Sequence, residues 1–228
     1  NNVAMTLAGL TNGTGSIVKD GTASLTIGSA ATNAYSGGFT LNSGNLYAAS
    51  NSAFGTGTLT ITGGVLSSDS TTARTFANAL SIAGDIVLGN AVRTGALTFM
   101  GNLDLGGSNR TAQIDSAVTF SGVLSNGQLL KTGAGVLTFT NGNTYTGGTT
   151  INAGTLQVSG SGLLGGGSYS GNIANSGVLI YSGTNNQTLS GVISGTGALT
   201  KNGTGTLTLA GNNNYSGGTT LNTGTLVI

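Results

Sequence analysis

The feature that most constrains this chain is repetition. Residues 131–158 and 201–228 align without a gap, and 15 of their 28 positions are identical. A third copy starts at Lys19 and has two extra residues before its tyrosine. Repetition on this scale indicates that each copy forms one structural unit and that like units stack on one another.

Each copy consists of short stretches with an apolar residue at every second position. In the second copy these stretches are 135–140, 149–152 and 154–158. Such alternation is typical of β-strands, and the glycines between the stretches suit tight corners. Evenly spaced short strands fit either an antiparallel sandwich or a parallel solenoid. The repetition favours the solenoid, because only there does each strand have equivalent neighbours above and below; the sandwich remains the alternative.

The copies share the pattern Lys-x-Gly-x-Gly-x-Leu-Thr-(Leu/Phe), followed by Asn-x-Tyr-(Thr/Ser)-Gly-Gly-Thr-Thr-x-Asn-x-Gly-Thr-Leu. This pattern closely resembles the autotransporter-associated β-strand repeat, also called the passenger-associated transport repeat. The resemblance is strong in residues 131–158 and 201–228 and weaker in 19–48. It implies a secreted protein of the bacterial cell surface with a right-handed parallel β-helix (β-solenoid) as its passenger, and it marks a type of coil, not an activity.

We expect one all-β domain, 1–228, with no helical domain and roughly ten coils. Coils about 4.8 Å apart would give a rod about 50 Å long. The expected repeat modules are 1–48, 120–158 and 185–228, with degenerate coils in 49–119 and 159–184. Further strands are expected at 57–62, 63–68, 76–82, 85–88, 96–100 and 113–120, and the glycine-rich run 160–171 is expected to be a loop or lateral bulge.

Four kinds of residue recur at fixed positions of the repeat. We expect the tyrosines to pack and brace the Gly-Gly corner, with an exposed sugar-stacking aromatic as the alternative. The lysines are expected to be exposed at corners, where they would discourage lateral sheet pairing, and asparagines and threonines at equivalent positions are expected to stack in hydrogen-bonded ladders. The positions are Lys19, Lys131, Lys201, Tyr35, Tyr145, Tyr215, Gly37, Gly38, Gly147, Gly148, Gly217, Gly218, Asn42, Asn152 and Asn222.

Composition argues against several classes of partner and cofactor. Only 5% of residues are charged and the net charge is +1, so neither nucleic acid nor an acidic membrane surface is an expected partner. The chain has no cysteine and no histidine, which removes the usual ligand sets for zinc, iron and copper. We assign no cofactor and no metal. A neutral surface rich in Thr, Ser and Asn favours self-association, end to end or lateral.

Seven of the eleven charged residues lie between residues 69 and 115. They alternate in sign, and spacings of 17 to 19 residues approach the length of one coil. The favoured interpretation is a ladder of compensating ion pairs. The alternative is a carboxylate pair, Asp85 with Asp104, acting as acid and base on a polysaccharide. The seven are Asp69, Arg74, Asp85, Arg93, Asp104, Arg110 and Asp115.

No catalytic residue is assigned, and the expected function is a structural or adhesive extracellular module, either a rigid rod or a head-to-tail fibre. The expected partners are further copies of the chain, and cell-surface or matrix glycans and proteins. The start of the chain has no signal-peptide pattern, so we interpret the chain as a processed or excised piece that would meet a membrane only through a translocator or anchor elsewhere. The alternative is a polysaccharide-active enzyme that uses Asp85 and Asp104, and the minor alternative is an ice-binding surface.

Overall fold

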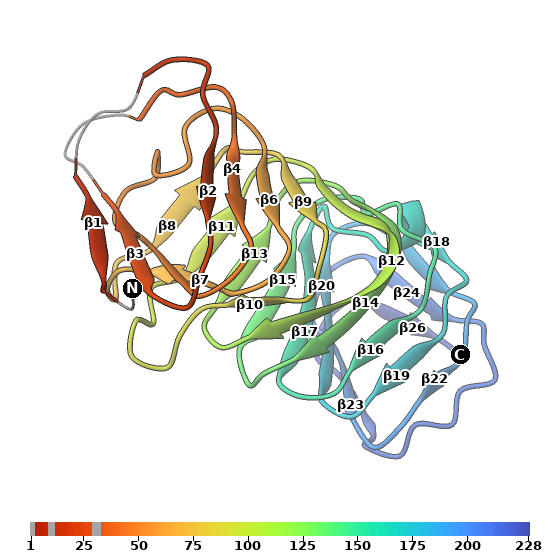
Figure 1. Cartoon of the computed structure of the whole chain (residues 1–228). Helices are drawn as coiled ribbons and strands as arrows, with labels where there is room; N and C mark the ends of the chain where they lie inside the picture. Colours follow the sequence, from red (N-terminus) through yellow and green to blue (C-terminus); the bar gives the residue numbers. More distant parts are fainter. Residues whose placement is uncertain (1–2, 9–11, 29–32) are drawn as a thin grey trace.

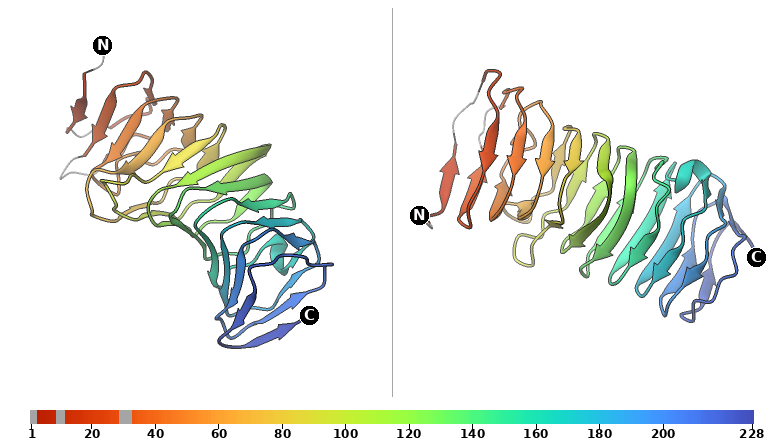
Figure 2. Two further views of the ribbon diagram at one scale, coloured as in Figure 1. Left: turned by 90° about the horizontal axis from the view of Figure 1, so that it is seen from below. Right: turned by 45° about the vertical axis from the view of Figure 1, so that its right-hand side comes forward.

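The strands of this protein stack in parallel into a column. The computed structural model describes residues 3–8, 12–28 and 33–228. The fold is an all-β parallel solenoid of about 11 turns, which confirms the expected architecture and lies close to the roughly ten coils expected. Successive coils lie side by side in chain order, and the two termini lie at opposite ends (Figure 1). The column bends near its middle (Figure 2, left).

Three sheets hold the described strands. The first has 14 strands, ten of which follow the order β1 (Met5–Leu7), β3 (Ser24–Ile27), β5 (Asn45–Ala48), β7 (Val65–Ser68), β10 (Ile86–Leu88), β12 (Leu103–Ile114), β14 (Leu124–Thr132), β16 (Thr149–Ile151), β19 (Ile173–Asn175) and β22 (Ile193–Ser194). The other four form a branch that joins β12, in the order β2 (Ile17–Lys19), β4 (Phe39–Leu41), β6 (Leu59–Ile61) and β9 (Leu80–Ile82).

The other two sheets cover the remaining sides. The second runs β8 (Arg74–Phe76), β11 (Leu97–Phe99), β13 (Val118–Phe120), β15 (Val136–Phe139), β17 (Thr155–Gly160), β20 (Val178–Gly183), β23 (Ala198–Lys201) and β25 (Thr219–Leu221). The third runs β18 (Ser168–Tyr169), β21 (Gln187–Leu189), β24 (Thr206–Leu209) and β26 (Thr225–Val227).

A typical strand has three residues, two pointing inward and one outward. In β11, Leu97 and Phe99 are buried and Thr98 between them is half-buried. The register places residues of the same kind on one another, so that Thr98 pairs with Thr119 of the next coil. This is the alternation seen in the sequence, and it fills the inside of the column with Leu, Ile, Val and Phe.

Two stretches that were expected as single strands are each divided by a corner. Residues 76–82 belong to β8 and β9, and residues 113–120 belong to β12 and β13. In the first case Asn78 is buried at the corner and its amide hydrogen-bonds the backbone of the preceding coil. Apolar residues on both sides of a corner give the same alternation as one longer strand, so the sequence does not reveal the break.

The strand β12 spans two sides of the column. One of its ends pairs with β9 and the other with β10. A register shift separates Asp104 from Ser108 where β12 pairs with β14, and Gly106 and Gly107 between them have φ values of 65° and 69°. These left-handed conformations, which glycine adopts without strain, allow the strand to turn the corner while staying paired.

The glycine-rich run 160–171 is not wholly irregular. It contains the 3-10 turn η1 (Gly165–Gly167) and the short strand β18. Among the described residues, η1 is the only helical element, and no helix there is long and apolar enough to span a membrane.

Candidate functional site

The repeat lysines are buried, and each reaches from one coil to the next. Their exposed fractions are 6% for Lys19, 0% for Lys131 and 0% for Lys201. The Nζ of Lys131 donates to the carbonyl oxygens of Thr132 (3.3 Å) and Gly133 (2.9 Å) in its own coil and of Ala153 (2.8 Å) in the next.

The other two lysines repeat this arrangement. Lys19 donates to Asp20 (2.8 Å), Gly21 (2.7 Å) and, in the next coil, Ser43 (2.9 Å). Lys201 donates to Gly203 and, in the next coil, Thr223 (3.1 Å). We call each such set of carbonyl oxygens with its ammonium group a lysine staple. The expectation of exposed corner lysines was therefore wrong: backbone acceptors at a buried corner need donors, and the lysine supplies them.

Burial has an electrostatic consequence for the staples. It lowers the pKa of Lys131 to about 8, although the charge of Asp115 acts in the opposite direction. It lowers the pKa of Lys201 as well, and that of Lys19 despite the opposing charge of Asp20. No carboxylate forms a salt bridge with these lysines among the described residues, so backbone carbonyl oxygens are the hydrogen-bond acceptors of each ammonium group, and Lys201 Nζ also lies 5.5 Å from the ring centroid of Tyr181.

The Asn-x-Gly segment of the repeat completes the staple. The backbone N–H of Asn42, Asn152 and Asn222 donates in each case to the carbonyl of the repeat lysine one coil earlier, at 2.9 Å. Two residues further on, the glycines of this segment have φ values of 65° to 81°. A Cβ on Gly44 or Gly224 would lie 2.7 or 2.6 Å from the lysine Nζ, so only glycine fits there.

The asparagine side chains form a ladder only in part. Asn42 Nδ2 donates to Asp20 Oδ1 (2.7 Å), and Asn222 Nδ2 donates to Asn202 Oδ1 (2.7 Å). Each bond joins adjacent coils, but the partner is an aspartate in one case and an asparagine of a different repeat position in the other.

The repeat tyrosines brace the Gly-Gly corners. Tyr145 is 1% exposed, and its hydroxyl shares a hydrogen bond of 2.8 Å with Thr149, on the far side of Gly147 and Gly148. The same Thr149 hydroxyl bonds to the hydroxyl of Tyr169 in the next coil (2.8 Å), which donates in turn to the Gly147 carbonyl. The corner and its neighbour therefore share one buried chain of hydroxyl groups.

The other two modules show how this corner varies. Tyr215 bonds to Thr219 across Gly217 and Gly218 as Tyr145 does. Tyr35 has no threonine at that spacing, and its hydroxyl donates to the Ala53 carbonyl (3.2 Å). The first glycine of each pair, Gly37, Gly147 or Gly217, lies so close to the preceding coil that a side chain would collide with its backbone, whereas Gly38 and Gly218 supply the positive φ.

Comparison with protein families finds the same three units. The model of the passenger-associated-transport-repeat family matches residues 17–48, 129–158 and 199–228. The chain carries passenger-associated transport repeats. Each match contains one lysine staple and its Asn-x-Gly segment. The comparisons with curated proteins and with solved structures gave no match.

Coils outside the passenger-associated transport repeats use amides in place of the lysine. Asn175 lies in the same row as Lys131, one coil beyond Ile151. Its side chain donates to the Ala198 carbonyl (3.0 Å) and accepts from the Gly177 N–H (3.1 Å). Asn78 is also buried and donates to three carbonyl oxygens of the preceding coil, at Phe54, Gly55 and Gly57.

A ladder of aromatic rings crosses from one repeat to the next inside the column. It contains all six phenylalanines of the chain, with neighbouring ring centroids 4.8 to 6.5 Å apart, a range in which aromatic pairs attract. Its members in order are Phe39, Phe54, Phe76, Phe99, Phe120, Phe139, Tyr145 and Tyr169. Sequence reasoning missed this ladder, although most of its phenylalanines are spaced by about one coil.

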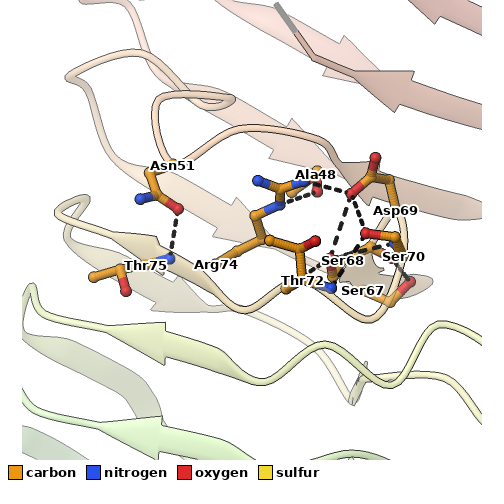
Figure 3. Close-up of polar contacts among 9 residues, drawn as sticks. All are labelled: Ala48, Asn51, Ser67, Ser68, Asp69, Ser70, Thr72, Arg74 and Thr75. Atoms are coloured by element: carbon orange, nitrogen blue, oxygen red, sulfur yellow. Dashed lines mark hydrogen bonds and ion pairs between the residues drawn. The ribbon is translucent and has the colours of Figure 1, made fainter. Parts of the chain in front are cut away.

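The charged cluster between the repeats forms one ion pair among the described residues. Arg74 Nη2 lies 2.7 Å from Asp69 Oδ1, and its Nε donates to the Ala48 carbonyl of the preceding coil (3.1 Å) (Figure 3). Burial alone would raise the pKa of Asp69, but the hydrogen bond and charge of Arg74 together hold it below its usual value.

The other charged side chains of the cluster have neutral partners. Arg110 Nε donates to the carbonyls of Ile82 (3.0 Å) and Leu105 (3.2 Å). The guanidinium of Arg93 lies over the ring of Tyr47, 3.9 Å from its centroid, and Asp115 accepts a bond from Gln113 (2.9 Å). The expected ladder of compensating ion pairs is thus wrong except at Asp69 and Arg74, because corner backbone groups take up most of these charges.

The two candidate acid–base residues do not share a depression. Asp85 accepts from the Thr111 N–H (2.8 Å) and lines a hollow with Val87 and Gln113. Asp104 accepts from the Gly106 N–H (2.8 Å) and lines a different hollow. Each carboxylate thus accepts a hydrogen bond from a backbone N–H, for Asp85 one of the next coil, and catalysis by this pair remains an untested prediction. The described residues contain no cluster of three or more His, Cys, Asp or Glu side chains suited to a metal.

Proposed function

We propose that this protein is a rigid extracellular rod, a module of a bacterial surface protein that works through its shape and its contacts and not through catalysis. Proteins with this repeat are extracellular or exposed at the cell surface. The observation that carries the proposal is the lysine staple, which recurs in each repeat and joins one coil to the next through buried hydrogen bonds. Buried lysines that join each repeat to the next coil should make the column resist bending and fraying.

The rod can be tested in solution. About 11 turns with strands about 4.8 Å apart give a particle slightly longer than 50 Å. Small-angle X-ray scattering and negative-stain microscopy of the monomer should both show an elongated, slightly bent particle of that length. A compact, round particle would refute the proposal.

The contacts are proposed to be adhesive and uncharged. Each of β11, β13 and β15 has an outward threonine, Thr98, Thr119 or Thr138, which offers hydroxyl and methyl groups to a neutral glycan or protein surface. Immobilised protein should therefore retain such ligands from a panel of cell-surface and matrix glycans equally well at low and high salt, since charges contribute little. Retention that disappears as salt is added would contradict this type of contact.

A single observation favours ice binding as a second candidate. Four threonines in successive coils form an unbroken outward row, Thr75, Thr98, Thr119 and Thr138. The next two positions of the row are Gln157 and Ile180, so the run of threonines ends at Thr138. Thermal hysteresis that is lost in Thr119→Tyr would support this function, and no hysteresis at any concentration would exclude it.

A further inference from the structure

We propose that Asn141 and Gly142 form a site at which the chain modifies itself: the backbone nitrogen of Gly142 attacks the side chain of Asn141, which loses its amide as ammonia. The inference goes beyond the proposed rod and does not depend on it. It assigns a covalent modification that changes the charge and the hydrogen bonds of one corner.

Asparagine followed by glycine occurs four times in the chain, at Asn12, Asn126, Asn141 and Asn202. Glycine has no Cβ and leaves the backbone nitrogen accessible, so each pair can react when the chain is unfolded. Asn12 adjoins residues 9–11, which lie outside the described part of the chain. The other three pairs are described, and their hydrogen bonds set them apart.

The backbone nitrogen of Gly142 lies beside the group that it would attack. Its N–H donates to Oδ1 of Asn141 at 2.8 Å. Because a carbonyl bond is about 1.2 Å long, this nitrogen is at most about 4 Å from Cγ. A small rotation of the side chain brings the two atoms to the separation of about 3–3.5 Å from which bonds form. Asn141 is exposed, so water reaches the pair.

The corner leaves this nitrogen without a backbone partner. Gly142 forms an isolated parallel bridge with Leu163 of the next coil, but its neighbours supply the hydrogen bonds. The Leu163 N–H donates to the Asn141 carbonyl (3.2 Å), and the Asn143 N–H donates to the Leu163 carbonyl (2.9 Å). The N–H of Gly142 therefore stays outside the bridge and faces its own asparagine.

The pair at Asn202 has the same sequence and a protected nitrogen. The Gly203 N–H donates to the Tyr181 carbonyl of the preceding coil (3.2 Å). The side-chain oxygen of Asn202 accepts a hydrogen bond from Asn222 (2.7 Å) and not from the following glycine. Attack at this pair therefore requires the coil contact to open first.

The pair at Asn126 is held by a strand. Asn126 and Gly127 lie inside β14, where Gly127 pairs with Ser108 of β12. The side-chain amide of Asn126 donates to Asp104 (3.1 Å). Turning this side chain toward Gly127 would break that bond, so the fold disfavours reaction here as well.

The reaction at Asn141 needs water and no other partner. The Gly142 nitrogen gives its proton to solvent and forms a bond to Cγ of Asn141, while the bond between Cγ and Nδ2 breaks and ammonia leaves with a proton from solvent. Water then opens the cyclic imide at either of its carbonyls. The product is aspartate or isoaspartate at position 141, with no change in oxidation state.

The product loosens contacts on both sides of the corner. The Asn141 side chain donates to the Ser121 carbonyl of the preceding coil (3.2 Å), whereas a carboxylate has no donor to offer and is repelled by that oxygen. Isoaspartate also lengthens the backbone beside the bridge to Leu163. The modified chain should therefore melt at a lower temperature than the unmodified chain.

Peptide mapping compares the three sites within one molecule. Trypsin cleaves after lysine and arginine, which places the sites in separate peptides, 111–131, 132–201 and 202–228. The folded protein is incubated at neutral pH, then digested and sequenced by mass spectrometry. Conversion at Asn141 should be at least about tenfold faster than at the other two sites. In urea the three rates should become similar, and the rate at Asn141 should not rise.

The matched control is Gly142→Ala. A Cβ on Gly142 would meet no atom within 4 Å, so the fold should be kept, but the methyl group should slow conversion at Asn141 at least about tenfold. Rates at Asn126 and Asn202 should not change. Circular dichroism checks folding, and Asn141→Gln, which keeps the amide but moves it away from the nitrogen, takes its place if needed and should show no conversion at that position.

Three results would overturn the inference. The first is equal rates at the three sites in the folded chain. The second is faster conversion at Asn141 after unfolding than before it, which would mean that the fold protects this pair. The third is unchanged conversion at position 141 in a folded Gly142→Ala or Asn141→Gln variant.

Discussion

At the scale of single residues, the buried lysines show most clearly how adjacent coils are held together. Three lysines with no salt-bridge partner among the described residues are each held by backbone carbonyl oxygens from two coils. Removing such a donor leaves its acceptors buried and unpaired, which costs more than the hydrogen bonds contribute in net terms.

Replacing Lys131 by methionine tests the staple. The substitution keeps the length of the side chain and removes its donors, so we expect the free energy of unfolding to fall by about 2–4 kcal/mol. Lys131→Ala should be at least as destabilised, but added ethylammonium or propylammonium should raise its melting temperature more than that of Lys131→Met, because only the alanine variant leaves room for the ion. Val92→Ala serves as the surface control. Equal effects of the ions on both variants would refute a carbonyl site selective for ammonium.

The pKa shifts predict an unusual dependence of stability on pH. The pKa of Lys131 is about 8 in the folded chain and about 10.5 when unfolded, so the unfolded chain binds more protons between these values and stability rises with pH. Burial raises the pKa values of Tyr35, Tyr145 and Tyr181 above 10, so stability falls again once unfolded tyrosines ionise. Denaturation midpoints should therefore peak near pH 9 to 10. Lys131→Met should flatten the rise, and an unchanged rise in that variant would contradict the assignment.

At the scale of elements, the corner decides how strands stack. The hydroxyl chain from Tyr145 through Thr149 to Tyr169 joins two coils, whereas the equivalent pair at the end of the column joins none. The two corners therefore have the same Tyr–Thr pair of hydroxyl groups, but a further coil covers the first corner and none of the described coils covers the second.

This contrast predicts different effects of one substitution. Tyr145→Phe should lower the free energy of unfolding by about 1–3 kcal/mol, because the Thr149 hydroxyl loses a buried partner. The matched change Tyr215→Phe should lower it by less than about 1 kcal/mol in the monomer, since water reaches the exposed Thr219. Urea denaturation of both variants measures the difference. Equal losses would show that the covering coil adds nothing to the corner.

The sequence predicted the strands better than the corners. Alternation and repetition are enough to predict short parallel strands in stacked coils, because most inward positions there are apolar. The lysine staples were missed, although Lys131 follows Leu129 at the spacing of an inward position. Charge alone suggested exposure, and only the carbonyl groups of a second coil, which the sequence does not display, explain why an ammonium group can be buried there.

At the scale of the whole molecule, the protein is a column in which equivalent residues of successive coils lie directly on one another. The cluster of charges did not form the expected ladder for the same reason, since stacking places backbone carbonyl or N–H groups beside these side chains more often than opposite charges. The aromatic ladder, by contrast, follows largely from stacking, because phenylalanines paired in successive coils, such as Phe99 and Phe120, bring their rings together, here with centroids 5.7 Å apart.

The most direct test of the column is a set of distances between spin labels. The chain has no cysteine, so pairs can be introduced at will, one label at Thr75 and the other at Gln157, Ile180 or Thr200, which lie four, five and six coils away in one row. Parallel stacking of the coils predicts mean distances of about 19, 24 and 29 Å plus a constant contribution from the labels, rising by about 4.8 Å for each coil. Distances that do not increase in this order would contradict parallel stacking of the coils.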